Sequence, residues 1–287
     1  MECLRSNGFE ITNNPFSRKL TKEELLDLLT DDTLGIIAGL EPLDREVLES
    51  SSLSAISRVG SGLSNIDLEA AEELGIEVCC TPGAPTTAVA ELTVGAMLSL
   101  MRMVPQMDRD LHSYKWNKRI GFQLEGKTVA IVGFGRIGNK VADLLESFRV
   151  NIIVVDPNIE EDNVNYPILP LTEALPQADI ITIHSSGENC ILGKREFSIM
   201  KTGVYLLNAA RGGLVSESLL MEALNNGRVV GAWLDTFSSE PYSGPLANYA
   251  NVILTPHVGT YTLECRLQME TEAVDNLVNA LSRKTDY

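Results

Sequence analysis

The sequence predicts an α/β protein made of two lobes with parallel sheets. Short apolar runs alternate with helical patterns along almost the whole chain, which is typical of strand–helix–strand units. With 287 residues and 44% apolar side chains, the chain can fill two medium-sized cores. A polar, loop-like connector at 112–126 precedes a fresh strand at Thr128. We therefore expect a smaller lobe formed by residues 1–81 and 263–287, and a larger lobe formed by residues 82–262.

The strands follow one another at regular intervals and leave room for helices between them. The candidate strands are 8–12, 34–39, 53–57, 76–80, 128–133, 151–156, 179–184, 203–208, 229–234 and 251–255. Thr21 and Glu24 form a capping box at the start of one helix. Asp67 is an expected N-cap of another. Residues 88–111 form the longest apolar helical stretch before the next strand, and its part "AVAELTVGAMLSL" is apolar nearly all round, so we expect burial between domains or between subunits.

Composition excludes several classes of partner. The net charge of −16 disfavours nucleic acid and anionic membranes as the main partner. The five cysteines are scattered and form no C-x-x-C pair, so we expect neither a disulfide framework nor a metal site. No apolar run approaches the ~18 residues of a membrane span, and the N-terminus is polar. We expect a cytoplasmic protein.

The most specific local pattern is "KTVAIVGFGRIGNKVADLLESF". An apolar strand runs directly into the glycine pattern of Gly133, Gly135 and Gly138, and an amphipathic helix follows. Gly133 makes the tight turn, Gly135 lets the backbone approach a pyrophosphate, and Gly138 lets helix and strand pack closely. The helix N-terminus, with Arg136 and Ile137, offers free N–H groups to an anion. This arrangement predicts a Rossmann-type dinucleotide-binding lobe.

The next strand ends in Asp156, eighteen residues after Gly138. A carboxylate at this place suits the ribose hydroxyls of an adenosine and repels a 2′-phosphate, so we expect NAD rather than NADP. The alternative is a glycine-rich turn that binds no ligand. Strand, helix and acid together favour the dinucleotide.

Further chemistry-bearing residues follow three later strands. Arg211, Asp235 with Glu240, and His257 come after the strands that end near 208, 234 and 255. Parallel strands deliver such residues to one edge of the sheet, where ligands bind. An arginine can bind a carboxylate and a histidine can exchange a proton with a carbonyl oxygen, so the set suits hydride transfer to a 2-keto acid.

Other histidines and small residues lie near this edge. His184 ends the strand at 179–184 and either lines the cofactor site or is a strand-end histidine with partners of its own. His112 is expected at the surface. Ala209 and Gly259 are small enough to let a cofactor approach the backbone.

These residues carry a family resemblance that covers essentially the whole chain. The chain resembles the D-isomer-specific 2-hydroxyacid dehydrogenases, most closely the phosphoglycerate dehydrogenase branch, through "SRVGSGLSNIDLEAAEELGIEV", "TPGAPTTAVAEL", "GKTVAIVGFGRIG", "NAARGGLV", "LDTFSSEP" and "TPHVG". The resemblance implies that Arg211 binds the substrate carboxylate. It makes Glu240 the partner of the acid/base His257, and it places Asp235 near the nicotinamide carboxamide.

The resemblance also implies features of the small lobe and of the assembly. The turn of Val59, Gly60, Ser61 and Gly62 would present backbone N–H groups to the substrate carboxylate across an interdomain cleft. Arg58, directly before this turn, is a further candidate for substrate binding. The small lobe would be flavodoxin-like but would lack its first strand, because the sequence begins inside the expected first helix. Three alternatives follow. The sequence has a truncated start, the strands of the small lobe pair in a different order, or the small lobe is less stable. A homodimer through the cofactor lobe is also implied.

Two departures from the family pattern are Ser64 and Ser216, which stand where the family usually has aspartate. Serine replaces aspartate as an N-cap at little cost, so Ser216 is expected to be harmless. Arg18 and Arg58 are the arginines that could meet a substrate phosphate, although the favoured interpretation of each is an ordinary surface or structural arginine.

The leading hypothesis is an NAD-dependent oxidoreductase that interconverts a D-2-hydroxy acid and its 2-keto acid. The expected substrate is 3-phosphoglycerate, an intermediate of serine biosynthesis, with hydroxypyruvate, glyoxylate or D-lactate as alternatives. A second hypothesis is an NAD(H)-sensing interaction protein, similar to dehydrogenase-like corepressors. It would bind the cofactor without turning over a substrate.

Overall fold

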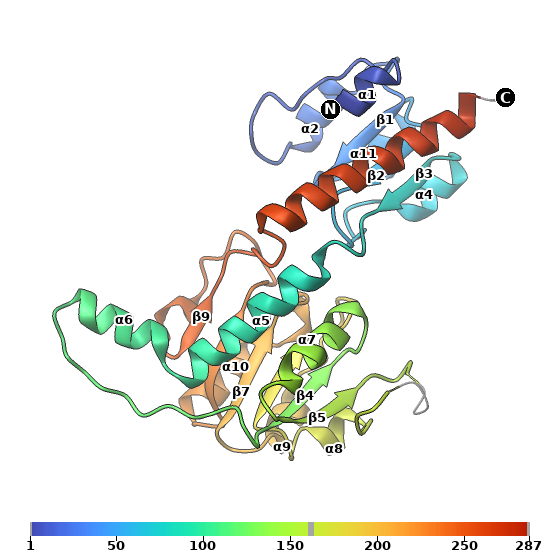
Figure 1. The fold of residues 1–287 in the computed structure, drawn as a ribbon. Helices are drawn as coiled ribbons and strands as arrows, with labels where there is room; N and C mark the ends of the chain where they lie inside the picture. Colours follow the sequence, from blue (N-terminus) through green and yellow to red (C-terminus); the bar gives the residue numbers. More distant parts are fainter. Residues whose placement is uncertain (1, 160–163, 286–287) are drawn as a thin grey trace. The chain divides into compact units, whose positions relative to one another are not determined.

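A computed structural model describes residues 2–159 and 164–285. They form two compact units, one of residues Met1–Pro85 with Tyr261–Tyr287 and the other of residues Thr86–Thr260. The expected α/β architecture is present in both: every sheet is parallel, and helices connect the strands (Figure 1).

The larger unit contains a six-stranded parallel sheet in the order β5-β4-β6-β7-β8-β9. Its strands are β4 (Thr128–Val132), β5 (Asn151–Val155), β6 (Ile180–Ile183), β7 (Val204–Asn208), β8 (Val229–Leu234) and β9 (Val252–Leu254). Its helices are α5 (Pro85–Met101), α6 (Val104–His112), α7 (Arg136–Glu146), α8 (Leu171–Ala174), α9 (Lys194–Ile199) and α10 (Glu217–Asn225), with 3₁₀ turns at Gly212–Leu214 and Pro245–Asn248. The strand order reverses between β4 and β6, the kind of point at which such sheets bind ligands.

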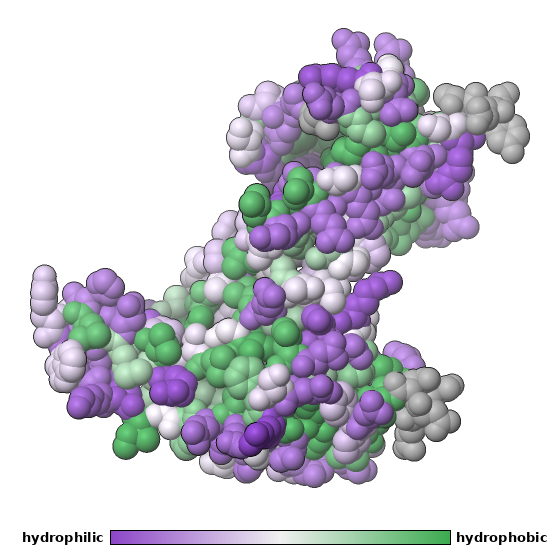
Figure 2. Space-filling model, in the orientation of Figure 1, coloured by the Kyte–Doolittle hydropathy of each residue, from purple (hydrophilic) through white to green (hydrophobic). Residues whose placement is uncertain are grey.

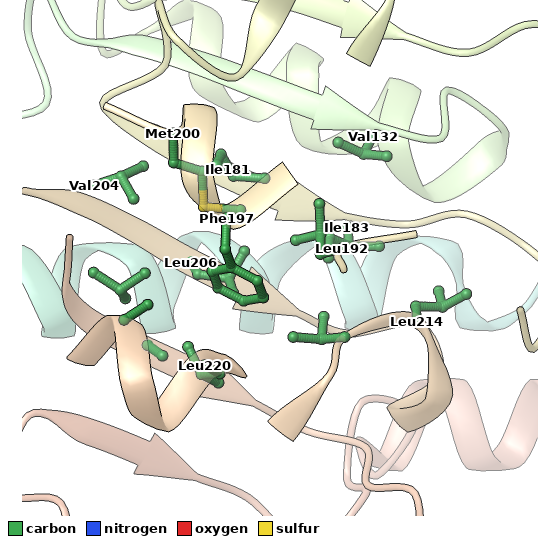
Figure 3. Close-up of a cluster of buried hydrophobic side chains, with 14 of the residues drawn as sticks. Val132, Ile181, Ile183, Leu192, Phe197, Met200, Val204, Leu206, Leu214 and Leu220 are labelled. Carbon is green, nitrogen blue, oxygen red and sulfur yellow. The ribbon is translucent and has the colours of Figure 1, made fainter. Parts of the chain in front are cut away.

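Two apolar layers hold this sheet. On one face, side chains of β6 and β7 such as Ile181, Ile183 and Leu206 meet Phe197 of α9 and Leu220 of α10 (Figure 3). On the other face, α5 and α7 cover the strands, as in the cluster of Met97, Met101, Val141, Leu145, Ile131 and Trp233. The central strands read as continuous apolar runs because both of their faces are buried.

The long helical stretch at 88–111 differs from the prediction. The structure breaks it into α5 and α6, which are bent by 66°. Met103 lies between them with a left-handed φ of 53°, and Pro105 occupies the first turn of α6, where a missing N–H costs nothing. α5 belongs to the core of the larger unit, and α6 with the segment after it extends away from the sheet (Figure 1).

The smaller unit has a three-stranded parallel sheet in the order β1-β2-β3. Its strands are β1 (Gly35–Ala38), β2 (Ala55–Arg58) and β3 (Glu77–Cys80), and its helices are α1 (Glu2–Ser6), α2 (Lys22–Leu28), α3 (Arg45–Glu49), α4 (Leu68–Glu73) and α11 (Leu263–Thr285). The capping box of Thr21 with Glu24 and the N-cap at Asp67 are both confirmed.

One predicted strand is wrong. Residues 8–12 form no strand, although Phe9 and Ile11 still pack against Leu4, Leu277 and Leu281. A strand requires a ladder neighbour, and this segment finds none among the described residues, so only its apolar side chains are used. The sheet is therefore not re-paired through residues 8–12.

Within the described ranges, no single helix is long and apolar enough to cross a membrane; only the bent pair of α5 and α6 reaches that length and composition together. The same part of the chain holds no group of three or more potential metal ligands.

Candidate active site

The glycine loop between β4 and α7 is as tight as its pattern predicts. Gly133 has a left-handed φ of 89°, and a Cβ on it would stand 2.5 Å from the backbone nitrogen of Ser185. A Cβ on Gly138 would stand 2.1 Å from the carbonyl oxygen of Gly133. By contrast, nothing lies within 4 Å of a Cβ position on the exposed Gly135. The loop is closed against the protein and open at Gly135, which is the shape a pyrophosphate needs.

Asp156 follows β5 and is tied to this loop. Its Oδ2 accepts a hydrogen bond from the Phe134 backbone N–H at 2.8 Å, and its Oδ1 accepts one from the Asn158 N–H at 3.0 Å. The carboxylate is thus fixed beside the glycine loop, with lone pairs left for ribose hydroxyls. Arg136 and Ile137 lie in the first turn of α7, where the N-terminal N–H groups are free for an anion. These residues fit a bound dinucleotide.

His184 lies directly after β6, on the neighbouring side of the loop. Its backbone N–H donates to Val132 O at 2.7 Å, and its Nε2 lies 2.9 Å from the Thr182 hydroxyl oxygen. Its Nδ1 is buried and has no partner within the described residues. Burial lowers the pKa of His184 to about 3, so the ring is neutral.

Arg211 comes three residues after the end of β7, in a turn held by the buried Asn208. The Asn208 Oδ1 accepts from the Ala210 N–H at 3.0 Å, and its Nδ2 donates to Arg211 O at 2.8 Å. The Arg211 guanidinium donates to Ala210 O at 2.8 Å, and no carboxylate of the described residues pairs with it. A half-buried cation with no anionic partner among the residues that the structure describes suits an anionic ligand. Ala209, in the same turn, is half-buried.

His257 and Glu240, which follow β9 and β8, lie within hydrogen-bond distance of each other. The His257 Nδ1 lies 2.9 Å from the Glu240 Oε2, and the Glu240 Oε1 accepts from the Phe237 N–H at 3.0 Å. Both side chains remain partly exposed, at 42% for His257 and 34% for Glu240. With Nδ1 engaged, Nε2 is the ring nitrogen left for a ligand.

Asp235, at the end of β8, is almost fully buried. Its Oδ1 accepts from the Thr255 hydroxyl at 2.6 Å and from the Val258 N–H at 2.9 Å. Its Oδ2 accepts from the Gly259 N–H at 2.8 Å. The carboxylate that was expected near the nicotinamide therefore holds the turn around His257 as well.

The turn at residues 58–62 belongs to the smaller unit. Gly60 has a φ of 120°, and its N–H donates to the Thr81 hydroxyl at 2.7 Å. The Val59 N–H donates to Ala38 O, and the Arg58 guanidinium donates to Val59 O. In the described part of the chain, the N–H groups of Ser61 and Gly62 have no such acceptor.

Arg18, the other arginine considered for a substrate phosphate, forms an ion pair with Glu24 at 2.6 Å and is largely exposed. This arginine, donating to the Glu24 carboxylate, lowers the pKa of Glu24 to about 2. Arg18 thus supports the start of α2.

Sequence reasoning assigned no supporting contact to Asn208 or Thr255, and it did not predict how closely Gly212 approaches another loop. All three stand beside residues that it named, in "NAARGG" and "TPHVG", but their roles depend on contacts between loops. A Cβ on Gly212 would stand 1.9 Å from the carbonyl carbon of Phe237, which shows how closely the Arg211 turn lies on the loop before Glu240.

Comparison with models of protein families shows which family the chain belongs to. The model of the D-isomer specific 2-hydroxyacid dehydrogenase NAD binding domain matches residues 94–259. The chain belongs to this family. NAD is the cofactor of the domain, and the matched residues fall within the larger unit.

Individual relatives agree with this assignment. The D-3-phosphoglycerate dehydrogenase of Methanocaldococcus jannaschii is 37% identical over 91% of this chain and 52% of its own length. The hydroxypyruvate reductase of Thermotoga maritima is 33% identical over 92% of this chain and 90% of its own. The crystal structure of the TT0316 protein from Thermus thermophilus has a TM-score of 0.91 at 34% identity and covers 98% of this chain and 93% of that one. The chain spans about half the length of the phosphoglycerate dehydrogenase that it matches.

Proposed function

We propose that this protein is an NAD-dependent dehydrogenase that interconverts a D-2-hydroxy acid and its 2-keto acid. The observation that carries the proposal is the His257–Glu240 pair, at 2.9 Å, on the same sheet edge as Arg211. The strand ends are in register there: the Asp235 N–H donates to Asn208 O, and the Thr255 N–H donates to Leu234 O. An acid/base pair and an anion binder thus stand after neighbouring strands β7, β8 and β9.

Each side chain has a part in the proposed reaction. Bound NAD supplies or accepts the hydride. Arg211 binds the substrate carboxylate through its guanidinium. His257 donates a proton from Nε2 to the carbonyl oxygen during reduction and takes it back during oxidation. Glu240 fixes the orientation of the ring and stabilises its charged form. Asp156, beside the glycine loop, favours NAD over NADP.

We propose 3-phosphoglycerate as the leading substrate, because the chain is similar to phosphoglycerate dehydrogenases over most of its length. Hydroxypyruvate is the second candidate. Two observations support this second candidate. The hydroxypyruvate reductase of Thermotoga maritima matches over nearly its entire length, and Arg18, one of the two arginines considered for a substrate phosphate, is already paired with Glu24. A cytoplasmic location stays a prediction from the sequence.

The test is oxidation of NADH, followed at 340 nm, with 3-phosphohydroxypyruvate, hydroxypyruvate, glyoxylate and pyruvate. We expect His257→Ala to lower turnover by about 10²–10⁴-fold while NADH binding is retained. We expect Arg211→Ala to raise the KM for the keto acid strongly. His112→Ala, which changes an exposed histidine outside the site, is the matched control. NADH binding without turnover of any keto acid would instead support the NAD(H)-sensing protein.

We also propose a homodimer through the larger unit. The segment after α5, residues 104–122, exposes several large apolar side chains, and Figure 2 shows green side chains among polar ones there. They include Leu111, Tyr114, Trp116, Ile120 and Phe122, of which Ile120 is 92% exposed. A patch of this kind is typical of an interface. Sedimentation should give a dimer for the wild type and a monomer for Trp116→Glu with Ile120→Glu.

A further inference from the structure

His257 lies in a turn with a backbone conformation that is uncommon for residues other than glycine. The φ of His257 is 52°, in the left-handed region, and its N–H donates to Thr255 O at 2.9 Å. A residue with a Cβ holds this conformation only where the surrounding structure imposes it. The contacts around the turn show what imposes it.

A buried carboxylate binds both sides of the turn. Asp235 accepts from the Thr255 hydroxyl, two residues before His257, and from the N–H groups of Val258 and Gly259, directly after it. Asp235 is 1% exposed, and a buried carboxylate without hydrogen bonds would be strongly unfavourable. Moving the turn would remove these donors, so the buried charge and the conformation of His257 stabilise each other.

The Thr255 hydroxyl is itself held from the core. Trp233 of β8 is fully buried, and its Nε1–H donates to the Thr255 Oγ1 at 3.0 Å. Because the oxygen accepts from Trp233, its own proton is directed to Asp235, at 2.6 Å. A chain of hydrogen bonds therefore runs from the core of the sheet to the base of the His257 turn.

We propose that Thr255 and Asp235 are positioning residues that hold His257 in its left-handed conformation and so keep its Nδ1 against Glu240. Neither has to touch the substrate for this role. The inference rests on the proposed function of His257, and it gives Asp235 a task separate from the contact with the nicotinamide that was expected for it. Asp235 would have two roles, the contact with the nicotinamide and the positioning of His257. Thr255 would have only the second, so a substitution of Thr255 gives the clearer test.

The first test measures the geometry of His257 without any turnover. The chain has three histidines, so the protein labelled with ¹⁵N-histidine gives a simple spectrum of imidazole groups, assigned with His112→Gln and His257→Asn. We expect Thr255→Val, which keeps the shape but loses the hydroxyl, to change the ring resonances of His257 and to leave those of His112 in place. Thr255→Ser, which keeps the hydroxyl, should restore the wild-type His257 pattern. An unchanged His257 pattern in Thr255→Val overturns the proposal.

The second test separates positioning from general damage. With the keto acid that the wild-type protein reduces fastest as the substrate, we expect Thr255→Val to lower kcat about tenfold or more, with the KM for NADH within about threefold of wild type. The isotope effect on kcat with NADH deuterated at the transferred position should rise, because a misplaced acid/base group makes the chemical step limiting. A lower kcat with an unchanged isotope effect would mean fewer active molecules and would overturn the proposal.

The two proposals fail in different ways. Wild-type protein that turns over no keto acid contradicts the proposed function, whereas the spectra still decide whether Thr255 positions His257. If Thr255→Val does not fold, Asp235→Asn serves as the second variant. It replaces one acceptor oxygen by an amide that cannot accept, and it should change the same His257 resonances.

Discussion

Gly212 offers the sharpest test of how the site is assembled. It follows Arg211 directly, and its φ lies outside the left-handed region, so alanine could adopt its backbone torsions. A Cβ would, however, stand 1.9 Å from the carbonyl carbon of Phe237 and 2.3 Å from the backbone nitrogen of Ser238. These are backbone atoms of the loop that leads to Glu240, and they cannot rotate away. Gly212→Ala must therefore push the Arg211 turn and the Glu240 loop apart by about 1 Å or more.

A shift of this size is expected to affect catalysis more than folding. A misplacement of about 1 Å can lower the rate about 10²-fold, and overpacking a core costs about 1–3 kcal/mol of the free energy of unfolding. We expect kcat/KM for the keto acid to fall about 10²-fold in the NADH assay. The dissociation constant for NADH should stay within about threefold, because the glycine loop lies on other strands. Thermal melting reports whether the protein remains folded.

The matched control is Gly193→Ala, at the start of α9, where the nearest atom to a Cβ is the Glu196 Oε2 at 3.4 Å. This variant should behave like the wild type in all three measurements. If Gly212→Ala retains kcat/KM within about threefold of the wild type, the close contact between the two loops does not align the catalytic groups, and the reasoning is refuted.

Three further predictions concern single side chains. Asp156→Ser, which removes the carboxylate beside the glycine loop, should lower the ratio of kcat/KM for NADH over that for NADPH about tenfold or more; an unchanged ratio would exclude Asp156 from cofactor choice. Glu240→Gln places an amide against the His257 Nδ1 and should lower kcat about 10²-fold or more with the KM for NADH retained, whereas near-normal turnover would show that the pair is not needed. Burial lowers the pKa of His184 to about 3, so the folded protein keeps this ring neutral while the unfolded chain binds a proton below about pH 6.5. Stability from this group is thus present above pH 6.5 and is lost as the pH falls, by at most about 1.4 kcal/mol per pH unit. Urea unfolding at pH 7.5 and pH 5.5 measures this effect. Between these pH values, the free energy of unfolding of His184→Gln should fall by about 1 kcal/mol less than that of the wild type, and an equal fall in both proteins would contradict the assignment.

The parts of the fold that could be predicted are those with a strong local signal. Nine predicted strands form within two residues of the expected ends, because a buried parallel strand is a continuous apolar run. The segment at 8–12 has only Phe9 and Ile11 as large apolar side chains, fewer than most of the predicted strands that form, and strand formation also depends on a neighbour that no local pattern reports. The break between α5 and α6 could have been expected from Pro105.

The candidate site shows the same difference between local sequence signals and contacts made in the fold. Strand ends brought Arg211, Glu240 and His257 into consideration, since a charged residue at the end of an apolar run is visible in the sequence. The supporting contacts were invisible: Thr255 has an ordinary hydroxyl, and only the fold shows that it lies between Trp233 and Asp235. Roles that depend on which two loops touch require the three-dimensional structure.

The order of strands in the larger sheet has a consequence for how such a protein can change. The residues that would hold the pyrophosphate and the adenosine ribose, the glycine loop and Asp156, follow β4 and β5, whereas Arg211, Glu240 and His257 follow β7, β8 and β9. One half of the sheet can therefore exchange its contacts with the adenosine end of the cofactor while the other half keeps its proton chemistry. Evolution, or an engineer, could alter the redox partner and the acid substrate in separate steps, each tolerated before the other is made.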